Sequence, residues 1–110
     1  MERFVKGDVV VLPFPFADLT ETKRRPAMII VRADVNVVIL CQITSQIVND
    51  PDAIQLSSSD FESGSLKKLS NIRPNRLFTA DERIISYRAG RLKAPKTLEV
   101  VERIVEILRR

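Results

Sequence analysis

The stretch GDVVVLPFPFADL at residues 7–19, followed by KRRPAMII at residues 23–30, decides the fold of this chain. Two short apolar runs rich in β-branched residues lie here, Val9–Leu12 and Ala27–Val31, the second of which extends one residue past the quoted segment. Runs of this kind, bounded by Gly, Pro and Asp, predict strands. The connection between them ends in three consecutive cations, residues 23–25. We therefore expect a strand pair with positive charge at its mouth, where a phosphate could bind.

The rest of the chain predicts more strands and one helix. Further strands are expected at Val37–Ile43, Ile54–Leu56, Leu66–Arg73 and Arg83–Tyr87. Pro74 should end the third of these, because proline has no N–H to donate to a sheet. A short helical turn is expected near residues 79–81. Apolar residues recur at helical spacing from Leu98 to Leu108, which predicts an amphipathic helix over Pro95–Leu108. Its wide apolar face would pack on the core or form a dimer interface.

Several short strands followed by one amphipathic helix predict a mainly β protein. The expected fold is a small, strongly bent sheet or barrel of antiparallel strands with the C-terminal helix packed on it. At 110 residues the chain fits a single domain covering residues 1–110. A core of this size gives modest stability, so burying apolar surface against a second copy would help.

Composition narrows the possible functions. The chain has 18 Lys and Arg against 14 Asp and Glu, a net charge of +4 that permits nucleic-acid binding. It contains no histidine, which excludes histidine-based ribonuclease chemistry, a Ser-His-Asp triad and a Cys-His pair. We see no tight carboxylate cluster for Mg²⁺ ions, so we expect no metal and no cofactor.

The cysteine count and the lengths of the apolar runs indicate the cellular compartment of the protein. The single cysteine, Cys41, lies in an apolar run and is expected to be a buried structural thiol. No run approaches the roughly 20 apolar residues that span a bilayer, and the N-terminus does not have the pattern of a signal peptide. We therefore expect a cytoplasmic protein without a membrane association.

The Gly7-Asp8 strand, the Pro-Phe turn and the Arg25-Pro26 step together resemble the opening of the MazF/PemK-like toxins of type II toxin–antitoxin systems. The resemblance implies an SH3-like barrel with a C-terminal helix, acting as a homodimer. It covers most of the chain and is strongest over residues 7–46 and 70–78. Two departures stand out: the loop 20–24 contains no glycine, and residues 49–65 match poorly.

The resemblance also implies a set of site residues. Arg25 takes the place of the catalytic arginine of the family, and Thr44 takes the place of the threonine beside it. A guanidinium can bind two phosphate oxygens at once and stays charged, which suits this role. Contacts with RNA are expected from neighbouring side chains: Lys23, Arg24, Phe16, Ser45, Gln46, Asn71 and Arg73. Arg73 is equally open to a structural ion pair.

The activity implied by the resemblance is sequence-selective cleavage of single-stranded RNA, chiefly mRNA, which stops translation until an antitoxin protein intervenes. Without histidine or a metal, the expected route is attack by the 2′-OH of the RNA on the adjacent phosphate. The general base is left open between water and a carboxylate such as Asp18. Two alternatives remain: a toxin of the same barrel type that binds DNA gyrase, and a non-catalytic SH3-like module that binds nucleic acid or protein.

Overall fold

The computed structural model describes residues 3–15 and 22–110. In this part of the chain, seven strands, two short 3-10 helices and one α-helix follow one another. Their order is β1 (Asp8–Pro15), β2 (Thr22–Arg32), β3 (Val37–Thr44), β4 (Ile54–Leu56), η1 (Ser58–Asp60), β5 (Phe61–Gly64), β6 (Ser70–Asp81), η2 (Glu82–Ile84), β7 (Tyr87–Leu92) and α1 (Ala94–Leu108).

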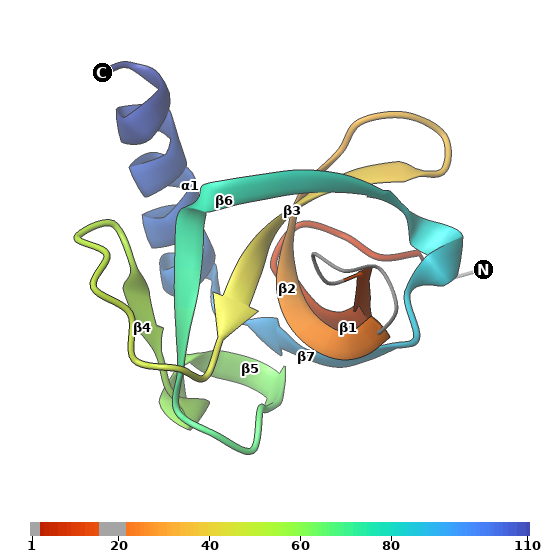
Figure 1. Cartoon of the computed structure of the whole chain (residues 1–110), viewed down its shortest axis with the longest axis horizontal. Coiled ribbons are helices and arrows are strands. Elements are labelled where there is room, and N and C mark those ends of the chain that lie inside the picture. The colour runs from red at the N-terminus through yellow and green to blue at the C-terminus, as the bar shows by residue number, and fades with distance from the viewer. Residues whose placement is uncertain (1–2, 16–21) are drawn as a thin grey trace.

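The strands form one sheet in the order β4-β6-β3-β2-β1-β7-β5, and every neighbouring pair is antiparallel. The sheet curls on itself, so that β6 passes over β1 and β2 while β7 passes beneath them (Figure 1). The predicted fold class, a small β barrel with a C-terminal helix, is confirmed as a curled half-barrel of seven strands.

The three central strands β1, β2 and β3 are buried on both faces. Alternate side chains along a strand point to opposite faces, and here each set enters a separate apolar cluster. Val9, for example, belongs to the cluster that includes the helix, whereas Val10 belongs to the other cluster. This double burial explains why the sequences of these strands are continuously apolar instead of alternating.

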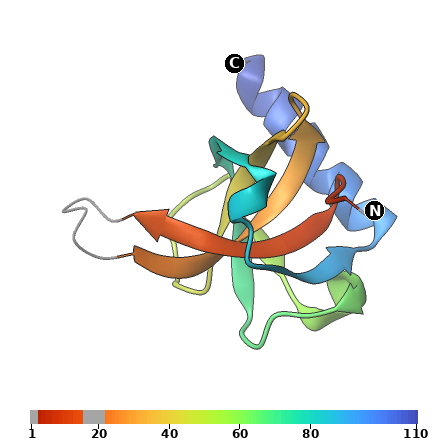
Figure 2. The same cartoon turned by 90° about the vertical axis from the view of Figure 1, so that its right-hand side faces the viewer.

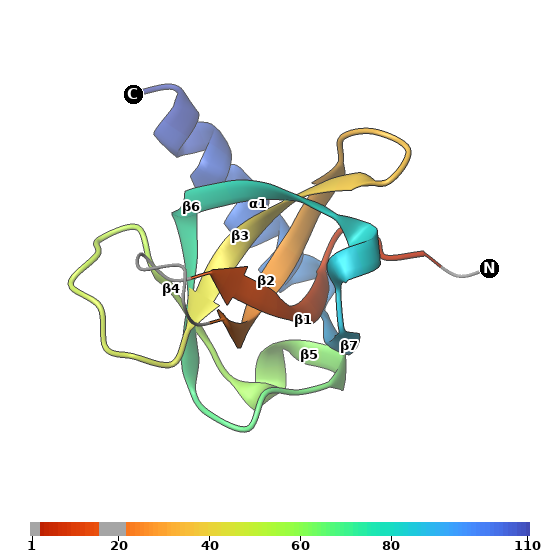
Figure 3. The same cartoon turned by 45° about the vertical axis from the view of Figure 1, so that its right-hand side comes forward.

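Helix α1 confirms the predicted C-terminal helix, with Pro95 in its first turn, where a missing N–H is harmless. It lies behind β2 and β3 in Figure 3, and in Figure 2 the ends of β1 and β2 at Pro15 and Thr22 point away from it. Val100 and Ile104 are its buried residues. Other apolar side chains of the helix remain exposed, namely Leu98, Val105 and Leu108. No helix in the described ranges is both long and apolar enough to traverse a bilayer.

The prediction of a strand over Leu66–Arg73 that Pro74 ends is wrong, because β6 begins at Ser70 and runs through Pro74 to Asp81. The register explains how a proline is tolerated. Cys41 of β3 lies opposite Leu77 and the next residue, Gln42, lies opposite Arg73. Residues 74–76 therefore form a bulge without β3 partners, where no ladder donor is needed. β6 turns a sharp corner along its length (Figure 1).

Two predictions around residue 80 are also wrong. Residues 79–81 belong to β6 and not to a helical turn, because they pair with β3 as far as Val37. The helical turn comes next, as η2, where a strand was expected at Arg83–Tyr87. The side chain of Asp81 accepts the backbone N–H of Arg83 at 2.9 Å and so caps this turn. The last strand, β7, therefore begins later in the sequence than expected, at Tyr87. β5 was not predicted as a strand.

Candidate functional site

The three cations of the opening motif lie on β2, the second strand of the β1–β2 hairpin. Strand β2 begins at Thr22, earlier than predicted, so Lys23, Arg24 and Arg25 face Phe14, Pro13 and Leu12 of β1 in turn. Lys23 and Arg24 are exposed, and Arg25 is half-buried. Because side chains alternate along a strand, Lys23 and Arg25 point to one face and Arg24 points to the other.

An aromatic contact supports the loop end of this hairpin. The Phe14 ring meets the Phe78 ring of β6 edge to face, with centroids 4.9 Å apart and an interplanar angle of 78°. This is a favoured geometry for aromatic pairs. Phe14 and Phe78 also pack against the second apolar cluster, so Phe14 is a packing residue. Phe16 and Asp18, expected as an RNA contact and as a possible base, lie outside the described residues.

Thr44 is the last residue of β3, at the point where the chain changes from apolar to polar. Its Oγ1 accepts the backbone N–H of Gln46 at 3.1 Å, a short local turn that fixes the hydroxyl. The side chains of Ser45 and Gln46 are exposed. Asn71 lies directly opposite Thr44 on β6 and donates its Nδ2 to the Gln46 carbonyl oxygen at 3.5 Å.

The register also relates Arg25 to Thr44. The β2–β3 ladder pairs Met28 with Cys41 and Ala27 with Gln42, where its described pairing stops. Arg25 and Thr44 each lie two residues beyond this last described pair, on β2 and β3 respectively. Residues two apart on a strand point to the same face, so Arg25 shares the face of Ala27 and Thr44 shares the face of Gln42. The two predicted catalytic residues therefore belong to one face of the sheet, Arg25 within β2 and Thr44 at the end of β3.

Arg73 lies on this same face, opposite Gln42, but its charge is paired. Its Nε is 3.2 Å from the Oδ2 of Asp50, in the β3–β4 loop. Burial tends to raise the pKa of Asp50, yet the backbone N–H of Asp52, together with Arg73 and Asn75, lowers the pKa below its ordinary value. The structural ion pair that the sequence left open for Arg73 is present.

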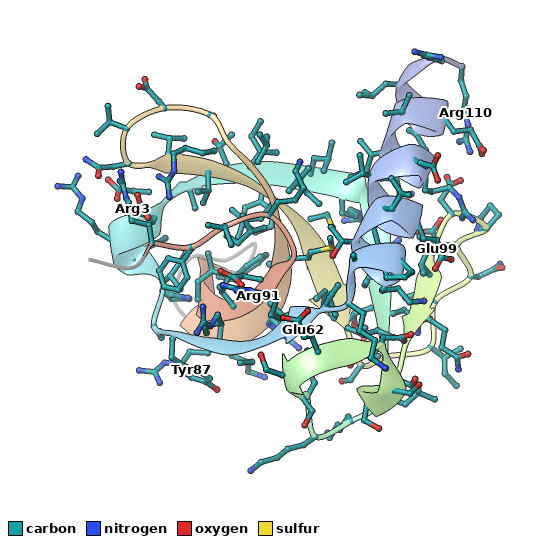
Figure 4. All side chains as sticks on the ribbon, turned by 180° about the vertical axis from the view of Figure 1, so that it is seen from behind. Arg3, Glu62, Tyr87, Arg91, Glu99 and Arg110 are labelled. Carbon is teal, nitrogen blue, oxygen red and sulfur yellow. The ribbon has the colours of Figure 1, made fainter. Side chains whose placement is uncertain are left out.

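The Gly7-Asp8 motif has a structural role outside the candidate site. Asp8 is fully buried, and its carboxylate accepts the Val5 backbone N–H at 2.9 Å and the Arg91 Nε at 2.8 Å. Arg91 is seen on the back of the molecule, on β7 (Figure 4). Gly7 has a φ of +93°, and a Cβ there would lie 2.8 Å from the Thr97 hydroxyl of α1. The motif thus braces β1 against β7 and lets the helix approach.

Three polar residues near the site were not predicted: Gln42, Gln55 and Asp50. A usable signal for the first two was present in the sequence. In Cys41–Thr44, Ile54–Leu56 and Asn71–Arg73, polar residues alternate with apolar ones, which places one polar face on each of three strands. Asp50 gave no comparable signal. Within the described residues, no group of three or more His, Cys, Asp and Glu side chains is arranged to hold a metal ion.

These features define a small β half-barrel with a cationic hairpin beside a polar sheet face. The sequence matches, over residues 5–108, the family described as PemK-like, MazF-like toxin of type II toxin-antitoxin system, and the chain belongs to this family. Comparison with curated protein sequences found no match.

Solved structures share the fold. MazF from Deinococcus radiodurans in a MazE–MazF crystal is 18% identical, with a TM-score of 0.79 over 99% of this chain and 98% of that one. MazF alone from the same organism is 19% identical, with a TM-score of 0.76 over 100% of both chains. An endoribonuclease in complex with its cognate antitoxin, from a mycobacterial species, is 11% identical, with a TM-score of 0.77 over 97% and 96%.

Proposed function

We propose that this toxin is an endoribonuclease that cleaves single-stranded RNA, chiefly mRNA, at selected sequences without a metal ion, and so blocks translation. The observation that supports the proposal is that Arg25 and Thr44 share one face of the sheet, each two residues beyond the last described β2–β3 pair, and that the exposed cations Lys23 and Arg24 precede Arg25 on β2. A structural relative is described as an endoribonuclease, which supports the same activity. No feature of the described residues favours the gyrase-binding toxin or the non-catalytic module.

The nucleophile would come from the RNA. Its 2′-OH gives up its proton to water or a carboxylate and its oxygen attacks the adjacent phosphorus. The bond from phosphorus to the 5′ oxygen breaks, and that oxygen takes up a proton. The products are a 2′,3′-cyclic phosphate and a 5′-hydroxyl. The protein needs only to align the attack and stabilise the charge that develops on the phosphate oxygens. This route requires no histidine, and the chain has none.

Arg25 would stabilise the developing charge, since its guanidinium can bind two non-bridging oxygens and is a poor base. Thr44 would orient the phosphate. Its Oγ1 already accepts the Gln46 N–H at 3.1 Å, which leaves the hydroxyl proton to donate to a phosphate oxygen. Lys23 and Arg24 would hold the neighbouring phosphates, and Ser45 and Gln46 would contact the RNA from the adjacent turn.

The partners follow from the same proposal. We expect a cognate antitoxin, because two of the structural relatives are complexes of a toxin with its antitoxin. We also expect a cytoplasmic homodimer of this single-domain chain. Among residues 3–15 and 22–110, the exposed apolar residues on the side of the sheet that carries α1 include Val31, Leu77, Leu98, Val105 and Leu108, and these could be buried in such a dimer.

The deciding experiment is incubation of the purified protein with single-stranded RNA in EDTA, followed by analysis of the fragment ends. We expect cleavage with cyclic phosphate and 5′-hydroxyl ends, and poor cleavage of double-stranded RNA, because in-line attack needs a backbone released from A-form geometry. A requirement for Mg²⁺, or products that carry 5′-phosphates, would reject the mechanism.

A further inference from the structure

Polar side chains continue the candidate site across two more strands. Thr44 of β3 pairs with Asn71 of β6, and Asn71 pairs in turn with Gln55 of β4. Paired residues point to the same face, so Thr44, Asn71 and Gln55 form a row across three strands. The neighbours of Gln55 in sequence, Ile54 and Leu56, are buried in the opposite cluster, and Gln55 itself is exposed. The row therefore leads from the phosphate-binding residues to an open edge of the sheet.

The chemistry of this row differs from that of the hairpin. Amide side chains carry no charge to neutralise a phosphate, but they present a donor and an acceptor side by side. That pattern matches the edge of an unpaired base, and asparagine and glutamine are common readers of bases. The cations of the hairpin would thus bind the RNA backbone, and the amides on β6 and β4 would bind the RNA bases.

Arg73 belongs with the amides and not with the hairpin cations. Its Nε bonds to Asp50, which also accepts the Asn75 Nδ2 at 3.4 Å and the Asp52 backbone N–H at 3.0 Å. The ion pair offsets the charge of Arg73 and fixes the plane of its guanidinium, while 19% of the side chain stays exposed. Because Asp50 offsets its charge, Arg73 is less suited than the hairpin cations to neutralise a phosphate, but its fixed guanidinium can still present an oriented pair of donors to a base edge.

The segments behind this row of side chains, the β3–β4 loop and β4, are hydrogen-bonded to residues of α1 and the C-terminus. Asp52, next to the Asp50 turn, accepts the Arg110 Nη2 at 2.5 Å, and its carbonyl oxygen accepts Arg103 at 3.1 Å. Arg110 lies at the C-terminal end of the helix (Figure 4). Lys96 donates to the carbonyl oxygen of Gln55 at 3.2 Å. Both the loop behind Arg73 and the short strand β4 are therefore held by the helix, which gives the row the rigidity that recognition needs.

We infer that Gln55, Asn71 and Arg73 form a base-reading surface that sets the RNA sequence preference, and that Asp50 is a positioning residue for Arg73. The inference rests on the proposed ribonuclease function and adds to it the part of the site that selects the sequence.

The test uses two RNA pools of random sequence. Fragment ends from a cleavable pool report the cleavage preference, and a 2′-fluoro pool, which has no 2′-OH to attack, reports the binding preference. We expect Gln55→Ala to weaken discrimination at one nucleotide position by roughly 5- to 150-fold, the range for one bidentate contact. Asn36→Ala, an amide variant in the β2–β3 turn, is the matched control and should keep the wild-type preference. An unchanged preference in Gln55→Ala would overturn the inference, and so would a uniform loss over all sequences.

Asp50 is tested through Arg73. We expect Asp50→Asn, which removes the charge but keeps the shape, to alter the preference at the same position as Arg73→Ala. In the double variant, the Asp50 change should add nothing to the effect of Arg73→Ala. Full additivity would show that Asp50 acts only on stability. Asp34→Asn serves as the carboxylate control, and thermal unfolding checks that every variant is folded.

The outcomes separate this inference from the ribonuclease proposal. A wild-type protein that binds selected sequences but does not cleave, with a binding preference that changes in Gln55→Ala, would reject the nuclease and retain the reading surface. A cleaving enzyme with unchanged preference in Gln55→Ala would reject the surface alone. Loss of affinity for an antitoxin, with RNA preference intact, would assign the row to the protein partner and overturn the inference.

Discussion

Arg25 is the residue on which the proposed chemistry depends most. Replacing it with alanine should lower the rate of RNA cleavage by at least about 100-fold, as expected for the loss of one preorganised charge-stabilising group. Arg25→Lys should restore little, because an ammonium cannot bind two phosphate oxygens in a planar fork. Single-turnover cleavage assays measure both effects, and circular dichroism verifies the fold.

Arg24 provides the control for this prediction, since it is the adjacent cation and points to the other face of β2. Arg24→Ala should weaken RNA binding with a much smaller effect on the cleavage step. A severe loss in Arg24→Ala together with a mild one in Arg25→Ala would show that the catalytic assignment is displaced by one residue.

Thr44 should matter through its hydroxyl. Thr44→Val keeps the shape of the side chain but can neither accept the Gln46 N–H nor donate to a phosphate, so cleavage should fall by about 10-fold, less than for Arg25→Ala. Thr44→Ser keeps the hydroxyl and should retain most activity. Equal rates for Thr44→Val and the wild type would remove Thr44 from the mechanism.

Cys41 is excluded from the chemistry by its surroundings. It is completely buried in β3, and burial raises the pKa of its thiol to about 12. Because the thiolate is the reactive form, a thiol in this state is inert near neutral pH. This agrees with the sequence-based expectation of a structural cysteine.

At the level of elements, one buried carboxylate ties together the N-terminus, the end of β2 and η2. Glu82 accepts two hydrogen bonds from Arg32, at 2.6 and 3.1 Å, and one from Arg3 at 2.5 Å. Arg32 also donates to the Phe4 carbonyl oxygen at 3.0 Å. The bonds from Arg32, followed by those from Arg3, lower the pKa of Glu82 against the opposing effect of burial.

This cluster should make the free energy of unfolding depend on pH in the acidic range. A lowered pKa in the folded state contributes stability above the ordinary value of 4.5, and that contribution is lost as the pH falls through the folded value. Glu82→Gln should therefore destabilise the protein at pH 7, by about 1–3 kcal/mol. The deficit should shrink at pH 3. Urea unfolding at both pH values measures it.

Glu102 on the exposed surface of α1 gives the matched control. Glu102→Gln should change the free energy of unfolding by less than about 0.5 kcal/mol at either pH, as is usual for surface positions. If the Glu82→Gln deficit were the same at pH 3 as at pH 7, the charge of Glu82 would not be its source.

At the level of the whole molecule, the exposed apolar face of α1 should be buried by a second copy. Light scattering at micromolar concentration should give a dimer for the wild type. Val105→Glu should weaken it, because a carboxylate would be buried without a partner. Val35→Glu, an equivalent change in the β2–β3 turn, should leave the dimer intact. A monomeric wild-type protein would contradict the dimer.

The antitoxin should compete with RNA for the same cationic side chains. We expect a small partner with an acidic segment that is disordered until it binds, and whose carboxylates compete with RNA phosphates for Lys23, Arg24 and Arg25. Inhibition of cleavage should be competitive and should weaken in high salt, because exposed charges are screened. A complex that leaves RNA cleavage unimpaired would reject this competition.

The sequence by itself determined the type of fold and its firmest elements. Apolar runs of β-branched residues specified β1, β2 and β3, and the helical spacing of apolar residues specified α1, because both signals are local periodicities. The motif around Arg25 and the turn at Thr44 also indicated family membership, and the family match over residues 5–108 supports it.

Only the tertiary structure decided the features that depend on pairing between distant residues. Pro74 reads as a strand end in sequence, but the bulge opposite Cys41 and Gln42 lets β6 continue. Gln55 joins Thr44 only through the register of two ladders. The bond between Arg73 and Asp50 spans 23 residues. Local patterns do not encode such contacts, because they arise when the whole sheet curls and fixes which strands become neighbours.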